Sequence, residues 1–259
     1  MDDNSVWDGN VFHYVKLIPQ GNAKIYNTTV YQGEIDVKEI TDGYLFVKNM
    51  HIEDASIIVR TNQYEVYIED LYLKNTSATL YGGDNVRYEN IVSDGAEVNV
   101  MGNYLNGLKT PGYVSVWYTP EDNETVKYND WVLNGTGANI RFRSSAQPLG
   151  GFEFNNLHIK TNNIAQFDRA IDVDANLGSL VLKNSSITAE SATANVLINF
   201  DNTVSVFRAI NSEFKTGVGV NLLDIGTSTE TSSWLYMNNI FTGVNLNNTT
   251  GTELNNFEE

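Results

Sequence analysis

The chain has 259 residues, with 32 acidic and 16 basic side chains, and its formal net charge at pH 7 is −16. This charge argues against binding to nucleic acid or to anionic membranes, since both need lysine and arginine. No cysteine is present, which excludes disulfide bonds and thiolate chemistry, and no apolar run reaches the length of a transmembrane helix.

Residues 1–40 contain two strand-like stretches, and we expect them to form an N-terminal cap or an attachment segment. The first ten residues are acidic and lack the apolar segment of a signal peptide, so none is expected. At the other end, residues 245–259 are polar, which predicts a frayed or partner-contacting C-terminal tail.

Residues 41–244 repeat one pattern, apolar-x-apolar-x-Asn/Asp-apolar-x-apolar. In "GFEFNNLHIK" the step from Phe154 to Leu157 is three residues instead of two, so the chain changes direction at Asn156. The centres of the eight matches are Asn49, Asp70, Asn90, Asp130, Asn156, Asn184, Asn211 and Asn239. Their spacings are 20 to 28 residues, apart from one of 40, which we interpret as two coils with a disguised corner near Thr110.

A repeat of this length predicts a solenoid in which each repeat is one coil. Asn and Asp tolerate the left-handed backbone region and turn the chain sharply. Stacked coils would place these residues above one another as an internal asparagine ladder, so Asn184 is expected to point inward. Helix signals are scarce. We therefore predict an all-β fold, a single-stranded right-handed parallel β-helix of about nine rungs.

The eight corner residues make the chain resemble the right-handed parallel β-helix, or pectate-lyase-like, superfamily. That resemblance implies the fold and leaves the activity open, because the superfamily includes polysaccharide lyases, glycoside hydrolases, phage tailspikes and surface adhesins. The Gly-His-Gly and Arg-x-Lys motifs of its polygalacturonase-like members do not occur in this sequence, and neither does the Trp-Ile-Asp-His motif of its pectate-lyase-like members.

Two charged pairs are candidates for chemistry. Asp172 and Asp174 alternate with apolar residues, so both carboxylates lie on one face of a strand, with a spacing that suits an acid/base pair or a shared calcium ion. Arg141 and Arg143 also share a face and would clamp an acidic sugar. The alternatives are an ordinary solvated strand face for the aspartates and surface ion pairs for the arginines.

Aromatic residues supply a candidate ligand surface. Tyr113 and Trp117 lie on the strand face opposite to two valines, and exposed flat rings suit stacking against sugars. The alternative is burial under the following loop or in a subunit interface. Trp131 is expected in the core. His51 and His158 are expected to face solvent, and we expect neither a metal site nor a cofactor.

The leading interpretation is a non-enzymatic structural or adhesive module of a virion (a tailspike, fibre or decoration component) or of a cell surface, located on the virion or outside the cell. Its expected partners are host-surface glycans or other surface proteins. The alternative is a polysaccharide depolymerase, a lyase or glycoside hydrolase, that uses Asp172, Asp174 and Arg141 or Arg143. A third possibility is an architectural spacer. We also expect a homo-oligomer, most simply a trimer, that covers apolar residues of the last coil, taken to be Leu235, Met237 and Ile240.

Overall fold

The computed structural model describes residues 5–19, 21–37, 43–61, 65–82, 86–94, 97–101, 104–117, 125–143, 150–161, 169–190, 196–224, 234–246 and 252–258. Every regular element within these residues is a β-strand. They contain no helix that is long and apolar enough to cross a bilayer. The chain divides into two compact units, Met1–Gly112 and Tyr113–Glu259, which are described separately.

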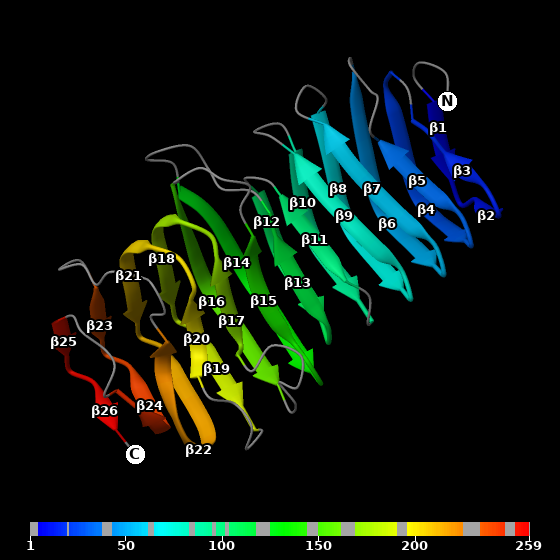
Figure 1. Cartoon of the computed structure of the whole chain (residues 1–259). Coiled ribbons are helices and arrows are strands. Elements are labelled where there is room, and N and C mark those ends of the chain that lie inside the picture. The colour runs from blue at the N-terminus through cyan, green and yellow to red at the C-terminus, as the bar shows by residue number, and fades with distance from the viewer. Residues whose placement is uncertain are drawn as a thin grey trace. The chain divides into compact units, whose positions relative to one another are not determined.

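The first unit holds twelve of these strands (Figure 1). They are β1 (Ser5–Asp8), β2 (Val11–His13), β3 (Lys16–Leu17), β4 (Ala23–Tyr31), β5 (Glu34–Val37), β6 (Tyr44–Glu53), β7 (Ser56–Thr61), β8 (Glu65–Lys74), β9 (Ser77–Gly82), β10 (Val86–Ser93), β11 (Val98–Met101) and β12 (Tyr104–Thr110).

The second unit holds the remaining strands. They are β13 (Tyr113–Val116), β14 (Thr125–Gly135), β15 (Asn139–Arg143), β16 (Gly151–Thr161), β17 (Ile171–Asp174), β18 (Leu177–Lys183), β19 (Ser186–Ala189), β20 (Val196–Phe200), β21 (Val204–Ile210), β22 (Glu213–Asp224), β23 (Leu235–Met237), β24 (Ile240–Asn245), β25 (Thr252–Leu254) and β26 (Phe257–Glu258).

Within each unit the strands pair in parallel with the equivalent strands of neighbouring coils. Strand β6, for example, pairs with β8 from Tyr44↔Glu65 to Glu53↔Lys74, and β7 pairs with β9. Parallel pairing at one-coil offsets, with only β-strands among the elements of the described residues, is the geometry of a solenoid. The all-β parallel β-helix expected from the repeat is therefore confirmed. Strands β1 to β5, which precede residue 41, pair in the same parallel manner, whereas the cap or attachment role of residues 1–40 stays a prediction.

The core of each coil comes from alternate residues of its strands. Val47 and Met50 in β6 are 1% and 2% exposed, and they stack on Ile68 and Leu71 of β8. In the second unit the core becomes aromatic. Trp131 is fully buried, as expected, and its ring lies 4.6 Å from that of Tyr128 and 5.3 Å from that of Phe154. Burial of such large side chains is the main stabilising contribution of the coil interior.

The corners lie where the repeat predicts them in seven of eight cases. Their φ angles run from +50° to +66°, in the left-handed region. They are Asn49, Asp70, Asn90, Asp130, Asn156, Asn184 and Asn211. The sequence prediction was wrong at the eighth, because Asn238 (φ +54°) holds the left-handed position while Asn239 is fully buried.

The disguised corner expected near Thr110 is Gly107, with φ +68°, three residues before Thr110, which is itself a buried inner residue. Gly107 follows Asn106, the parallel partner of Glu89, and so occupies the position of Asn90 in the next coil. A Cβ atom there would lie 2.9 Å from the Asn90 Oδ1 atom, so glycine also fits the tight approach to the neighbouring corner.

The asparagine ladder runs along the outside of the coils, so the predicted inward orientation was wrong, for Asn184 among others. Its members are exposed or half-buried. The residues two before and one after each corner, such as Val47 and Met50 around Asn49, both point inward, which leaves the corner side chain outside. Amide Nδ2 groups donate to the preceding corner: Asn49 to Asn27, which is also left-handed (φ +48°), at 2.7 Å, Asn90 to Asp70 (3.1 Å), Asn156 to Asp130 (2.5 Å), Asn211 to Asn184 (3.5 Å) and Asn238 to Asn211 (3.1 Å). Asn27 itself donates to Asp8 (2.9 Å), the residue before the left-handed Gly9.

A short internal polar ladder does exist, one residue after the corners of the last coils. The backbone N–H of Ser185 donates to Ser212 Oγ (3.2 Å), that of Ser212 to Asn239 Oδ1 (2.9 Å), and that of Asn239 to Asn256 Oδ1 (3.0 Å). The Asn239 amide also donates to the Ala209 carbonyl (2.9 Å). These side chains, which are buried except for the half-buried Asn256, thus satisfy backbone groups at the corner, where the strand ladder is interrupted.

Candidate functional site

The predicted site residues of the second unit lie together on the outer face of three neighbouring strands. Ser115 of β13 pairs with Arg141 of β15, and Arg141 pairs with Asp172 of β17. Asn199 of β20 continues the row after Asp172. The register therefore places residues that are far apart in sequence side by side, in successive coils.

Arg141 binds both predicted carboxylates. Its Nε atom lies 3.2 Å from Asp172 Oδ2, and its Nη2 atom donates to Asp174 Oδ2 at 2.9 Å. Partial burial lowers the pKa of the guanidinium, but the hydrogen bond to Asp174 and the charge of Asp172 raise it by more, so the net shift is upward. Arg141 thus stays charged and ties the two aspartates into one ion-paired group.

Asp172 is the buried centre of this group, with only 3% of its surface exposed. Its Oδ1 atom accepts a hydrogen bond from Asn199 Nδ2 at 3.0 Å and lies 3.2 Å from Arg169 Nη1. With Arg141 on the other oxygen, both carboxylate oxygens have charged or polar partners. A buried carboxylate that is satisfied in this way is held in place and poorly placed to meet a substrate.

Arg143 joins the predicted aromatic surface. Its Nη2 atom donates to the Tyr113 hydroxyl group at 2.5 Å, which also accepts a 2.7 Å hydrogen bond from Ser115 Oγ. The guanidinium lies 5.0 Å from the Trp117 ring centroid and 5.7 Å from that of Tyr113. Trp117 remains 37% exposed. Tyr113, Trp117 and Arg143 therefore form one cation–π cluster with an accessible indole. The loop expected to cover it lies outside the described residues.

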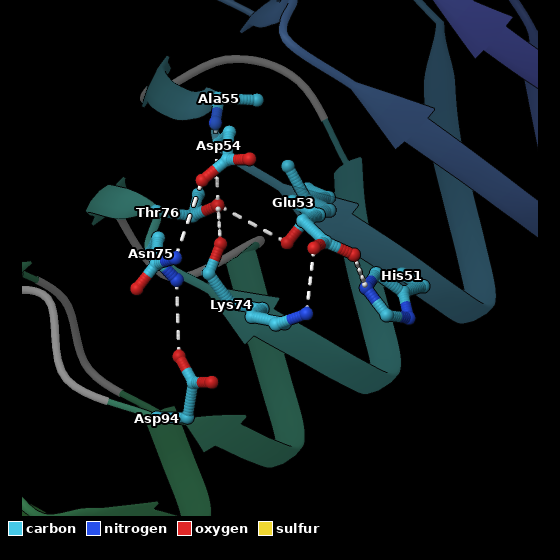
Figure 2. Close-up of polar contacts among 9 residues, drawn as sticks. His51, Glu53, Asp54, Ala55, Lys74, Asn75, Thr76 and Asp94 are labelled. Atoms are coloured by element: carbon cyan, nitrogen blue, oxygen red, sulfur yellow. Dashed lines mark hydrogen bonds and ion pairs between the residues drawn. The ribbon is translucent and has the colours of Figure 1, made fainter.

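In the first unit one group of polar contacts surrounds the turns that follow β6 and β8 (Figure 2). Glu53 accepts a 2.6 Å hydrogen bond from Lys74 Nζ and lies 3.3 Å from His51 Nε2. The bond from Lys74 lowers the pKa of Glu53 below its ordinary value. Asn75 donates its side-chain amide to Asp54 (3.2 Å) and its backbone N–H to Asp94 (3.0 Å).

The histidines have partners and do not simply face solvent as expected. His51 contacts Glu53, and its ring packs 4.9 Å from that of Tyr72. His158 is hydrogen-bonded through one ring nitrogen to Ser186 (2.7 Å) and through the other to Asn156 (2.6 Å). In the part of the chain that the structure describes, no three His, Asp or Glu side chains come together as metal ligands.

Sequence reasoning missed an aromatic row on the outer face of the first unit. Phe46 and Tyr67 occupy the outward position between the two inner residues of their strands, and their ring centroids lie 5.1 Å apart. Tyr26 extends the row, 5.6 Å from Phe46. The signal is present in the repeat, since the variable position between the first two apolar residues is aromatic in "LFV" and "VYI".

Comparisons with protein-family models, with curated proteins and with solved structures find no match to this chain.

Proposed function

We propose that the chain is a non-enzymatic structural or adhesive β-helix module of a virion or cell surface, whose outer faces contact glycans. The observation that carries this proposal is the closed ion-pair group in the second unit. Arg141 holds both Asp172 and Asp174, and Asn199 and Arg169 complete the coordination of Asp172. A general acid or base must reach a proton on its substrate, whereas Asp172 is already engaged through both oxygens.

The proposal also covers the superfamily, the type of surface component, its partners and its oligomeric state. A parallel β-helix with asparagine corners fits membership of the pectate-lyase-like superfamily and, within it, a tailspike, fibre or decoration component. Surface-bound glycans or other surface proteins would be its partners, on the virion or outside the cell. A homotrimer remains part of the proposal, and light scattering tests it, since a mass near 28.9 kDa would mean a monomer.

Glycan contact in the second unit is assigned to Trp117 with Tyr113. The indole is the more exposed ring, and Arg143 adds hydrogen-bond donors beside it. Trp117→Ala should reduce binding to cell-surface glycans while the circular dichroism spectrum stays unchanged. Loss of the folded spectrum would instead assign Trp117 to the structure of the coil and remove it as a ligand residue.

A polysaccharide depolymerase is the alternative, and one observation favours it: two carboxylates and a guanidinium do meet on one outer face, at Asp172, Asp174 and Arg141. An assay of reducing sugars released from bacterial capsular polysaccharides separates the two functions. The adhesive proposal expects no release above that of the Asp172→Asn variant. Release that this substitution abolishes would establish the enzyme instead.

A further inference from the structure

A groove opens on the outer face of the first unit, across strands β6, β8 and β10. Its volume is about 280 Å³, which suits one small ring and is below the range of drug-sized ligand pockets. Side chains of outward-facing residues form most of its lining, and the inner residues Leu45 and Val66 contribute the rest. The outward-facing residues are Tyr44, Phe46, Glu65, Tyr67 and Arg87.

The aromatic wall of this groove is held in place before any ligand arrives. Phe46 and Tyr67 stack with an angle of 21° between their rings. The Tyr67 hydroxyl group donates to Glu89 at 3.0 Å, and the Tyr104 hydroxyl group donates to the same carboxylate at 3.2 Å. Burial and the bond to Glu89 raise the pKa of Tyr67 to about 12, so this donor stays protonated. A wall fixed in this way costs little conformational entropy on binding.

Two charges of opposite sign complete the lining. Glu65 and Arg87 are both exposed, and the Arg87 guanidinium is positioned 5.5 Å from the centroid of the Tyr104 ring. One carboxylate acceptor and one guanidinium donor beside aromatic rings are the groups that recognise neighbouring hydroxyls on a ring with apolar C–H faces. The lining as a whole is close to neutral, and the chain carries a net charge of −16, which repels polyanions.

We propose that this groove binds one sugar unit of a neutral polysaccharide, with the ring against Phe46 and Tyr67 and its hydroxyls toward Glu65 and Arg87. This inference rests on the proposed glycan-contacting function and adds a second, independent site and the class of its ligand. An acidic polysaccharide would meet the repulsion of the whole chain with only one guanidinium in the groove to offset it.

Native gel electrophoresis through gels containing dextran, mannan, galactan or glucomannan tests the proposal, with polygalacturonate as the acidic polymer. The protein should be retarded by at least one neutral polymer and not by polygalacturonate. Tyr67→Ala and Arg87→Gln should each weaken that retardation about tenfold, equivalent to ~1.4 kcal/mol. Arg87 is exposed, so its variant stays informative if Tyr67→Ala fails to fold.

Tyr72→Ala is the matched control, because Tyr72 is an outward aromatic residue, 36% exposed, on the part of β8 after the corner. It should leave retardation unchanged. Retardation that Trp117→Ala abolishes but Tyr67→Ala and Arg87→Gln do not would overturn this inference and leave the proposed function standing. Retardation by polygalacturonate alone would overturn the neutral ligand class. Retardation by none of the polymers would overturn both proposals.

Discussion

Replacing Arg141 with methionine should destabilise the second unit strongly, because it removes one partner of a buried charge. The substitution keeps most of the side-chain volume and deletes the contacts at 3.2 Å to Asp172 and 2.9 Å to Asp174. Breaking a buried ion pair in this way costs about 3–5 kcal/mol when the remaining charge has no other partner. Asp172 keeps Asn199 and Arg169, so we expect a loss of about 2–3 kcal/mol.

Urea unfolding followed by circular dichroism measures this loss, and a double-mutant cycle assigns it. Adding Asp172→Asn removes the stranded charge, so the double variant should recover more than half of the lost stability. Arg208→Met, at an exposed position on β21, is the control and should change stability by less than about 0.5 kcal/mol. A loss for Arg141→Met no larger than that of the control, or no recovery in the double variant, would refute the buried-charge reasoning.

Substitutions at three further positions test other parts of the fold. Asn156→Leu places a branched side chain at φ +66° and removes the hydrogen bond to Asp130, so thermal unfolding should show that the free energy of unfolding falls by about 1–3 kcal/mol. Asn156→Gly should lower it by less, because glycine adopts this backbone conformation without strain. Asn239→Ala leaves the Ser212 N–H and the Ala209 carbonyl without their buried partner, for a loss of about 1–3 kcal/mol in urea; a change within error would argue against the internal ladder. The pKa of Glu53 is lowered in the folded chain, so its carboxylate stabilises the fold at pH values above the ordinary pKa of 4.5. This stabilisation is lost as the pH falls through the lowered pKa. Glu53→Gln should therefore flatten the acid limb of the stability profile, and an unchanged limb would count against the Lys74 bond.

The coils could be predicted from the sequence because each coil repeats the same local pattern of residues. An apolar alternation interrupted by Asn or Asp fixes both the corner and the faces on either side, as at Asn156. Gly107 was missed because a glycine turns the chain without carrying the amide that the pattern searches for.

The coil of β23 and β24 was expected to be the last, but β25 and β26 pair with it in parallel and continue the solenoid. Its inner residues were misread because both alternating sets of residues are apolar. Leu235 and Met237 were assigned inward, but the structure buries Tyr236 between them, together with Trp234 and Phe241, and leaves Ile240 42% exposed. The larger rings fill the interior and shift the corner by one residue. The apolar residues invoked for trimer formation therefore lie on the outer surface of the coil, and not at its inner positions.

The candidate site was predictable only in part. Alternation placed Asp172 and Asp174 on one face of a strand, yet it did not reveal that Arg141 lies directly beside Asp172. That pairing depends on the length of the segment between β15 and β17, which differs from coil to coil and follows no pattern in the sequence. The groove of the first unit was not predicted for the same reason, because its lining residues come from three consecutive coils.

Because the coils of the first unit stack in register, the length of the solenoid can change by one complete coil at a time. Glu53 lies beside Lys74, and the turn residues that follow them, Asp54 and Asn75, are both left-handed. A chain joined directly from Glu53 to Asn75 would lose one complete coil and keep an uninterrupted sequence of corners, core residues and strand partners. Gene duplication or excision in multiples of about one coil thus gives this architecture a means of changing its reach without inventing new contacts.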